Sequence, residues 1–425
     1  MRRFFYPVLF GNSAIRWIWG SLLSLGCLSA AGQTPCWSDT VAACNARRFP
    51  ELAQPHLQTP NDAIAASQRS VATIPVVVHV VYKGNFENIS DEQIFSQMTV
   101  LHADYRRLNA NAVTVPPPFA PLAADMELEF CLANRAPDGT PSNGITRRPT
   151  IWDNIGQQKA PDGRPRINYT DLGGEDAWDP AHYLNIWVCG IGGGILGFAT
   201  YPGTAPLPED GVVIDPRFFG TIGLAALYYP HHLGRTATHE IGHYFNLLHI
   251  WGGDSDSCDD DDGVADTPVQ RSAYQGCPAY PQFSCGNSAM FMNYMDYTDD
   301  ACMSLFTLGQ KARVWAALNT TRASLLDSNY CAVVPVAEPG AAVRQISIAP
   351  NPVQEKITLD LAELPDGPAL IRIANPAGQI LEQRTVEWFA GSPVSIDVAR
   401  LPEGCYALCI QAYGTMLTRR FIKTR

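Results

Sequence analysis

Residues 238–249 read THEIGHYFNLLH, and their types and spacing suit a metal ion bound beside a general base. On a helix, His239 and His243 are four residues apart and project from one face, so both imidazoles can bind one Zn²⁺. Glu240 lies beside them, and a carboxylate there can take a proton from metal-bound water and pass it to a leaving amine. The segment therefore predicts zinc-dependent hydrolysis of an amide bond.

A third imidazole is available only if the helix stops. His249 follows His243 by six residues, about 240° further round a continuous helix, and would point away from the metal. Asn246 lies between them, and after Gly it is Asn that most readily adopts the left-handed conformation that ends a helix. We therefore predict a sharp turn at Asn246 that returns His249 as third ligand. Three protein ligands leave one position open, as in catalytic zinc sites.

Elements before this helix would position the site. A β-branched run at 75–82 predicts a buried strand, and Ser90 with Gln93 predicts a capping box that opens a helix reaching Leu108. A second strand at 184–188 leads into a glycine-rich stretch, which is either a plain loop or a strand edge that pairs with a substrate backbone. The residues expected to bind substrate in this way are Gly197, Phe198, Ala199, Thr200 and Tyr201.

Residues 254–268 carry seven acidic side chains and no basic one. Carboxylates at this density repel one another unless a cation neutralises them. Hard oxygen ligands suit Ca²⁺, although the spacing is not that of an EF-hand, and a solvated acidic loop is the alternative.

The zinc motif, continued by residues 293–297 (NYMDY), resembles the metzincin metallopeptidases and, within them, the pappalysin family with its ulilysin-like members. The resemblance spans 74–331, and Asn246 departs from it where metzincins generally have Gly. It implies an α+β fold, a metzincin-type catalytic domain with a twisted mixed sheet and an active-site helix. It also implies a zinc-dependent endopeptidase in which Met295 underlies the metal and Tyr297 hydrogen-bonds the oxyanion.

The same resemblance implies calcium near the active site, because residues 263–268 (GVADTP) match the family. The first choices for ligands are Asp254, Asp262, Asp266 and Thr267. Four cysteines surround this loop, and spacing cannot choose among their three pairings. The resemblance suggests Cys258–Cys285 and Cys277–Cys302. Because relatives often cleave before a basic residue, Asp299 and Asp300 are expected to favour a basic P1′ side chain.

The N-terminus indicates export. Residues 1–31 combine arginines, an apolar stretch and small residues, typical of a cleaved signal peptide, with a membrane anchor or a lipidated Cys27 as alternatives. Residues 32–70 suit a propeptide. Removing Cys27 leaves eleven of twelve cysteines, an odd number in an oxidising compartment. Either Cys36 or Cys44 is a cysteine switch that ligates zinc and keeps a zymogen latent, or the two bond to each other.

The C-terminal part is built differently. The catalytic domain is assigned to 71–331 and a linker to 332–343, while residues 344–425 contain seven short alternating runs that predict a small all-β sandwich. This last segment resembles the C-terminal sorting domain of type IX secretion cargo. The resemblance implies passage through the periplasm, handling by outer-membrane secretion machinery, and a final location outside the cell or on its surface.

Composition limits the remaining function classes. A hydrophobic content of 46% with 17% charged residues describes a globular chain, and a net charge of −11 argues against nucleic-acid binding. No transmembrane helix is expected in the mature chain. The expected function is therefore a secreted zinc endopeptidase acting on peptides or proteins. Its rivals are a catalytically silent surface adhesin on the same fold and a zinc hydrolase of non-peptide amides.

Overall fold

The computed structural model describes residues 36–52, 71–253, 256–328, 330–331, 347–360, 367–374, 380–388, 393–412 and 415–424. The expected signal peptide, the linker and most of the expected propeptide lie outside these residues. Within the described ranges, no helix is both long and apolar enough to span a bilayer.

The catalytic part is built on a six-stranded mixed sheet in the order β2-β1-β4-β6-β5, with β3 also paired to β1. Its strands are β1 (Ala72–Tyr82), β2 (Leu128–Leu132), β3 (Ile145–Pro149), β4 (Leu184–Val188), β5 (Gly197–Ala199) and β6 (Val212–Ile214). All pairings are parallel except that of β5 with β6. The short antiparallel strand β5 therefore forms one edge of the sheet, and the expected mixed sheet is confirmed.

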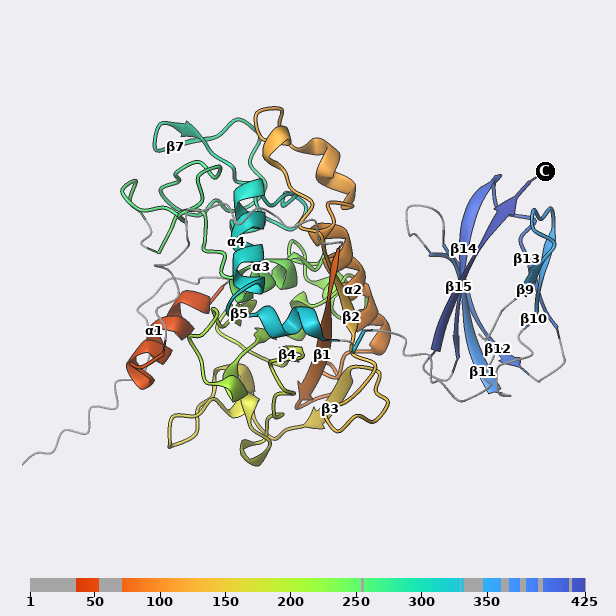
Figure 1. The fold of residues 1–425 in the computed structure, drawn as a ribbon, viewed down its shortest axis with the longest axis horizontal. Coiled ribbons are helices and arrows are strands. Elements are labelled where there is room, and N and C mark those ends of the chain that lie inside the picture. Colours follow the sequence, from red (N-terminus) through yellow and green to blue (C-terminus); the bar gives the residue numbers. More distant parts are fainter. Residues whose placement is uncertain are drawn as a thin grey trace, which may run out of the picture.

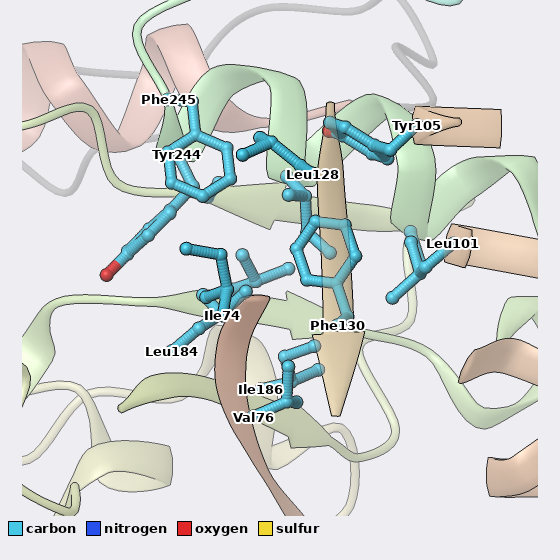
Figure 2. Packing of buried hydrophobic residues seen from close by; sticks show 14 of the residues in the cluster. Ile74, Val76, Leu101, Tyr105, Leu128, Phe130, Leu184, Ile186, Tyr244 and Phe245 are labelled. Atoms are coloured by element: carbon cyan, nitrogen blue, oxygen red, sulfur yellow. The ribbon is translucent and has the colours of Figure 1, made fainter. Parts of the chain in front are cut away.

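β1 is the central support of this sheet. It is buried from Ile74 to Val81 because β2 and β3 pair with successive halves of one side while β4 pairs with the other. β-Branched side chains pack well on such a doubly covered strand. Figure 2 shows Ile74 and Val76 packing with Leu184 and Ile186 of β4 in the main core.

Four α-helices are described: α1 (Ser38–Arg48), α2 (Asp91–Tyr105), α3 (Arg235–Tyr244) and α4 (Leu308–Leu318) (Figure 1). The Ser90 side chain caps α2 by accepting a hydrogen bond from the Gln93 amide at 3.3 Å, as predicted. The Gln93 side chain instead donates to the carbonyls of Pro216 and Phe219, so the reciprocal half of the capping box is replaced by a contact with a distant loop.

The predicted extent of α2 was wrong at its end. The helix stops at Tyr105, and Leu108 is 65% exposed, outside the core. Arg107 takes a positive φ of 51°, which turns the chain away from the helix axis. Tyr105 itself remains buried and donates a hydrogen bond to the Thr238 carbonyl at 3.1 Å, which joins α2 to α3.

The C-terminal part forms two sheets, with strand orders β13-β10-β9 and β12-β11-β14-β15 (Figure 1). Their strands are β9 (Ser347–Ala349), β10 (Lys356–Asp360), β11 (Gly367–Ala374), β12 (Ile380–Trp388), β13 (Val394–Asp397), β14 (Gly404–Ala412) and β15 (Thr415–Lys423). Every strand pair is antiparallel, and the two sheets share a hydrophobic cluster of their own. All seven runs predicted from the alternating pattern are strands, which confirms a small β-sheet domain.

Candidate active site

The chain reverses direction where the third imidazole requires it. α3 ends at Tyr244, and Asn246 adopts φ = 73°, as predicted. The Leu247 amide then donates to the Gly242 carbonyl at 2.9 Å, which closes the helix end. His249 is thereby carried back toward α3 and is 3% exposed.

The three imidazoles converge through the same ring atom. The Nε2–Nε2 distances are 3.0 Å for His239 and His243, 3.1 Å for His243 and His249, and 3.3 Å for His239 and His249. His239 Nδ1 lies 2.7 Å from the Tyr294 carbonyl and His243 Nδ1 lies 2.7 Å from the Leu247 carbonyl. A carbonyl accepts only a proton, so these Nδ1 atoms carry the hydrogen and the Nε2 lone pairs face one another.

This donor arrangement fits a zinc ion. Zn–N bonds of about 2.0–2.1 Å in a tetrahedron place ligand nitrogens about 3.3 Å apart. Burial, together with the charge of His249, lowers the pKa of His239 to about 3, and burial likewise holds the pKa of His243 well below its usual value. Both rings are therefore neutral, which metal coordination requires.

Met295 lies directly under the metal-binding helix. It is fully buried, and its amide donates to Asn293 Oδ1 at 2.9 Å, which fixes the turn that carries it. A Cβ added at Gly242 would lie 2.5 Å from the Met295 sulfur, so only glycine permits this close approach. The Met295 side chain therefore packs against α3 at Gly242, between the positions of His239 and His243.

Glu240 is also buried, at 1% exposure, because the N-terminal segment covers it. Its Oε2 atom accepts hydrogen bonds from Ser38 Oγ at 2.9 Å and from the Cys36 thiol at 3.4 Å. Burial raises the pKa of Glu240 to about 8, against the lowering effect of these two hydrogen bonds. On the other side, a Cβ at Gly197 would meet Glu240 Cγ at 3.0 Å, so glycine lets the β5 edge approach the carboxylate.

Residues 36–39 lie along β5, at the edge expected to bind substrate. Cys36 forms a parallel bridge with Gly197, and the Trp37 amide donates to the Gly197 carbonyl at 3.1 Å. The Ala199 amide donates to Ser38 Oγ at 2.8 Å. Asp39 accepts from Tyr201 OH at 2.7 Å and lies 3.0 Å from His249 Nδ1. Sequence reasoning missed Ser38 and Asp39, because neither belongs to a motif.

Cys36 and Cys44 are not bonded to each other. Cys36 carries a free, buried thiol, whereas Cys44 is disulfide-bonded. The alternative in which the two form one disulfide was therefore wrong. The Cys36 sulfur and the donor nitrogens of the three histidines all lie within 4.8 Å of one another. Cys189, the other free cysteine of the described residues, is buried in a separate cluster.

The remaining residues expected to bind substrate have varied positions. Gly197, Phe198 and Ala199 form β5, but the Thr200 amide donates to the Gly211 carbonyl and its hydroxyl to Asp210. The Tyr201 hydroxyl lies behind the metal site, 3.2 Å from His243 Nδ1. Tyr297 OH is 3.0 Å from His249 Nε2, the ring nitrogen of His249 that faces the other two histidines.

A small cavity of about 30 Å³ adjoins the metal site. It is lined by His239, Glu240 and Tyr297, and also by Asp300 and His231, whereas Asp299 is not part of its wall. Asp300 is 1% exposed; its Oδ2 accepts from the Leu233 amide at 2.7 Å, and its Oδ1 lies 3.7 Å from His231 Nδ1. An acidic group therefore stands at the wall of a pocket next to the reacting centre.

The acidic loop is only partly described, and Asp254 lies outside the described residues. Asp262 is buried; its Oδ1 accepts from Thr267 Oγ1 at 2.6 Å, while its Oδ2 has no hydrogen-bond partner. Burial raises the pKa of Asp262 to about 7. Asp266 points elsewhere, accepting from Thr307 Oγ1 and from the Gly309 amide at the start of α4.

Three disulfides join described residues of the catalytic part. Cys258–Cys285 and Cys277–Cys302 occur in the pairing that the resemblance suggested. The third, Cys131–Cys331, joins β2 to the end of the catalytic part across 200 residues of sequence. The sequence analysis did not predict this last pair, because neither cysteine lies in a recognisable motif.

Converging imidazole lone pairs, an adjacent carboxylate and a methionine support at the edge of a mixed sheet define a metalloendopeptidase. Residues 169–319 match the peptidase M43 family model, described as pregnancy-associated plasma protein-A. The chain belongs to this family, as its relatives also indicate. Residues 347–424 match a secretion-system C-terminal sorting domain, so the protein is exported to the cell surface or beyond.

Related proteins agree with this assignment. The chain is 28% identical over 304 residues to an extracellular metalloprotease of Arthroderma benhamiae, covering 70% of this chain and 96% of the relative. It is 32% identical to one of Uncinocarpus reesii, covering 60% and 80%. Neither relative is described as an adhesin.

Two solved structures from one organism are similar to this chain. Mature mirolysin of Tannerella forsythia, in complex with a cleaved peptide, is 46% identical with a TM-score of 0.57 and matches 61% of this chain and 96% of its own. A promirolysin mutant from the same organism is 41% identical with a TM-score of 0.57, matching 67% and 91%. The proenzyme thus matches a larger share of this chain than the mature enzyme does.

Proposed function

We propose that this secreted metalloendopeptidase hydrolyses peptide bonds of protein substrates with one Zn²⁺ held by His239, His243 and His249. The observation that carries the proposal is the convergence of three Nε2 atoms at 3.0–3.3 Å. When bound there, zinc supplies a Lewis acid that polarises a carbonyl and lowers the pKa of water to about 7.

The side chains around the metal have separate roles in this proposal. Glu240 Oε2 takes a proton from the attacking water and later gives it to the leaving nitrogen. Tyr297 OH donates a hydrogen bond to the oxyanion as it develops. The Gly197 carbonyl and the Ala199 amide hold the substrate backbone, since the N-terminal segment already uses these two groups through Trp37 and Ser38.

The first experiment separates metal binding from proton transfer. Processed enzyme is assayed on casein with and without chelator, and its metal content is measured by mass spectrometry. Glu240→Ala is expected to keep about one zinc per chain while its rate falls by roughly 10²–10⁴. Hydrolysis that persists at the original rate in this variant contradicts the mechanism.

We further propose that Cys36 keeps the unprocessed enzyme latent by binding the metal as a thiolate. Its free thiol and its position within 4.8 Å of the histidine donors support this. Cys36→Ser is expected to raise the activity of the unprocessed chain, and Cys189→Ser, at the other free cysteine, is the matched control. Equal, unraised activity in both variants contradicts the switch.

The pocket next to the site is proposed to accept a basic P1′ side chain. Asp300 supports this, because it lines the cavity beside Glu240. Peptides that differ only in Arg or Leu at P1′ should differ about tenfold in kcat/KM, and Asp300→Asn should reduce that ratio toward one. Equal cleavage before Arg and before Leu by the unmutated enzyme would contradict the proposed P1′ preference.

Calcium is proposed to bind at the acidic loop through Asp262. Its buried, unpartnered Oδ2 is the supporting observation, since such an atom ordinarily has a proton donor or a cation beside it. Ca²⁺ at 100 times its Kd should stabilise chelator-treated protein by about 2.7 kcal/mol, and Asp262→Asn should remove most of this effect. An unchanged melting temperature on adding Ca²⁺ contradicts the proposal.

A further inference from the structure

A second contact of the N-terminal segment lies at the far end of α1 from the metal site. Arg48 Nη1 lies 2.8 Å from Glu209 Oε2, and its Nη2 lies 3.1 Å from Oε1, so the guanidinium and carboxylate pair through two parallel hydrogen bonds. Tyr169 OH donates to the same Oε1 at 3.0 Å. This planar, two-point geometry is typical of specific carboxylate–guanidinium recognition.

Glu209 belongs to the catalytic domain, in a 3-10 turn (Leu207–Glu209) between β5 and β6. Its side chain is 4% exposed, although it carries a charge. A buried carboxylate ordinarily needs a cation, and here that cation is Arg48, from the segment expected to be removed. Lys159 is close enough for the charge of Glu209 to raise its pKa, but burial lowers that pKa more, and Lys159 forms no ion pair among the described residues.

We propose that Glu209, with Tyr169, is a binding site for a basic side chain of the substrate in the processed enzyme. The inference rests on the proposed removal of residues 32–70. Loss of Arg48 would uncover a carboxylate that already pairs with a guanidinium at two points and that the Tyr169 hydroxyl holds in place. In the unprocessed protein Arg48 fills this site, so the propeptide imitates a substrate there as well as at the metal.

The distance between Glu209 and Glu240 determines which substrate residue the Glu209 carboxylate would contact. Ser38 contacts Glu240 at one end of α1, and Arg48 contacts Glu209 at the other. Eleven helical residues span roughly 15 Å at 1.5 Å each. An extended peptide covers that length in about four or five residues at 3.3 Å each. The basic residue should therefore lie about four or five positions from the cleaved bond, apart from any P1′ preference.

The first test uses processed enzyme and peptides with a fixed P1′ Arg. One additional Arg, or Gln as the uncharged match, is moved through each position up to six from the bond. Arg should raise kcat/KM about tenfold over Gln at one position four or five residues away. Glu209→Gln should bring that ratio near one, while Asp153→Asn, an exposed carboxylate paired with Lys83, should leave it unchanged.

The second test needs no catalysis. A synthetic peptide of residues 36–52 is titrated into processed enzyme carrying Glu240→Ala, with binding followed by fluorescence anisotropy. Changing Arg48 of the peptide to Gln should weaken binding about tenfold, and the same peptide change should have little effect on the Glu209→Gln enzyme. Because the Arg48 change lies in the peptide, it cannot disturb the folding of the enzyme.

Three results would overturn the inference: no Arg preference in the unmutated enzyme, a preference that Glu209→Gln leaves intact, or a Glu209 variant that slows all peptides equally. If instead no peptide is cleaved at all, the proposed catalysis fails, and the inference is decided by binding of the same Arg and Gln peptides to the Glu240→Ala enzyme: tighter binding of the Arg peptide that Glu209→Gln abolishes supports the site, and equal binding overturns it. A peptide coupling without any substrate preference would mean that Glu209 serves latency alone, which contradicts the proposal.

Discussion

Asn246 offers the sharpest test of how the backbone builds the metal site. Its φ of 73° is a left-handed conformation, which costs an ordinary L-residue roughly 1–2 kcal/mol and costs glycine nothing. Its side-chain Oδ1 is buried without a hydrogen-bond partner, so that atom offers no compensating bond. Asn246→Gly should therefore preserve the turn, whereas Asn246→Val should strain it by about 1–2 kcal/mol or more, because β-branched residues tolerate this region poorly.

The strain in Asn246→Val can have two effects, and both are measurable. If the turn holds, Asn246→Val lowers the free energy of unfolding by that amount. If the turn opens, His249 moves from the other two rings, and zinc affinity in competition with a chelating dye falls about tenfold for each 1.4 kcal/mol. Asn246→Gly is the matched control for loss of the side chain. The reasoning is refuted if the Val variant matches the natural protein in both stability and zinc affinity, or if the Gly variant is as weakened as the Val variant.

Three further predictions concern the support of the site. Gly242→Ala should destabilise the fold by about 1–3 kcal/mol through its clash with the methionine sulfur, whereas Gly84→Ala, which meets nothing within 4 Å, should not; denaturant unfolding of both would show it. Burial raises the pKa of Asp296 to about 7, above its unfolded value, so its stabilising contribution is present at pH 4 and is lost as the pH rises through 7. The stability of the natural protein minus that of Asp296→Asn, measured by unfolding at each pH, should thus fall by a few kcal/mol over this range, and a constant difference would contradict it. Replacing both Cys131 and Cys331 with Ser should cost about 2–5 kcal/mol because the disulfide closes a loop of 200 residues, and an unchanged denaturation midpoint would count against this reasoning.

The part of the site that depends on local chain geometry was predictable from the sequence. The spacing of His239 and His243 needs only a helix, and the position of Asn246 needs only a known backbone preference. The seven C-terminal strands follow from alternation and turn residues for the same reason. Each of these signals lies within a few residues of the feature that it predicts.

Features that depend on distant contacts were not predictable in this way. Ser38 reaches Glu240 across 202 positions, and nothing in the sequence around Ser38 marks it as a partner of that carboxylate. Asp266 was grouped with the other acidic residues because of its sequence position, yet its carboxylate binds the beginning of α4. Sequence proximity identified an acidic loop but could not show which carboxylates lie close to one another in the folded chain.

The contacts of residues 36–39 differ in chemistry, which has a consequence for how the protein becomes active. Cys36 brings sulfur to the histidines, Ser38 brings a neutral hydroxyl to Glu240, and Asp39 brings a negative charge to His249. Oxidants attack the first of these groups, but neither oxidants nor mild acid disturbs the other two, because the Ser38 hydroxyl is inert and, against the effect of burial, the contact with His249 holds the pKa of Asp39 well below its usual value. A fluctuation in redox state or acidity during transit outside the cytoplasm would therefore leave part of these contacts intact, and we expect that irreversible scission of the peptide chain would be needed to remove all of them.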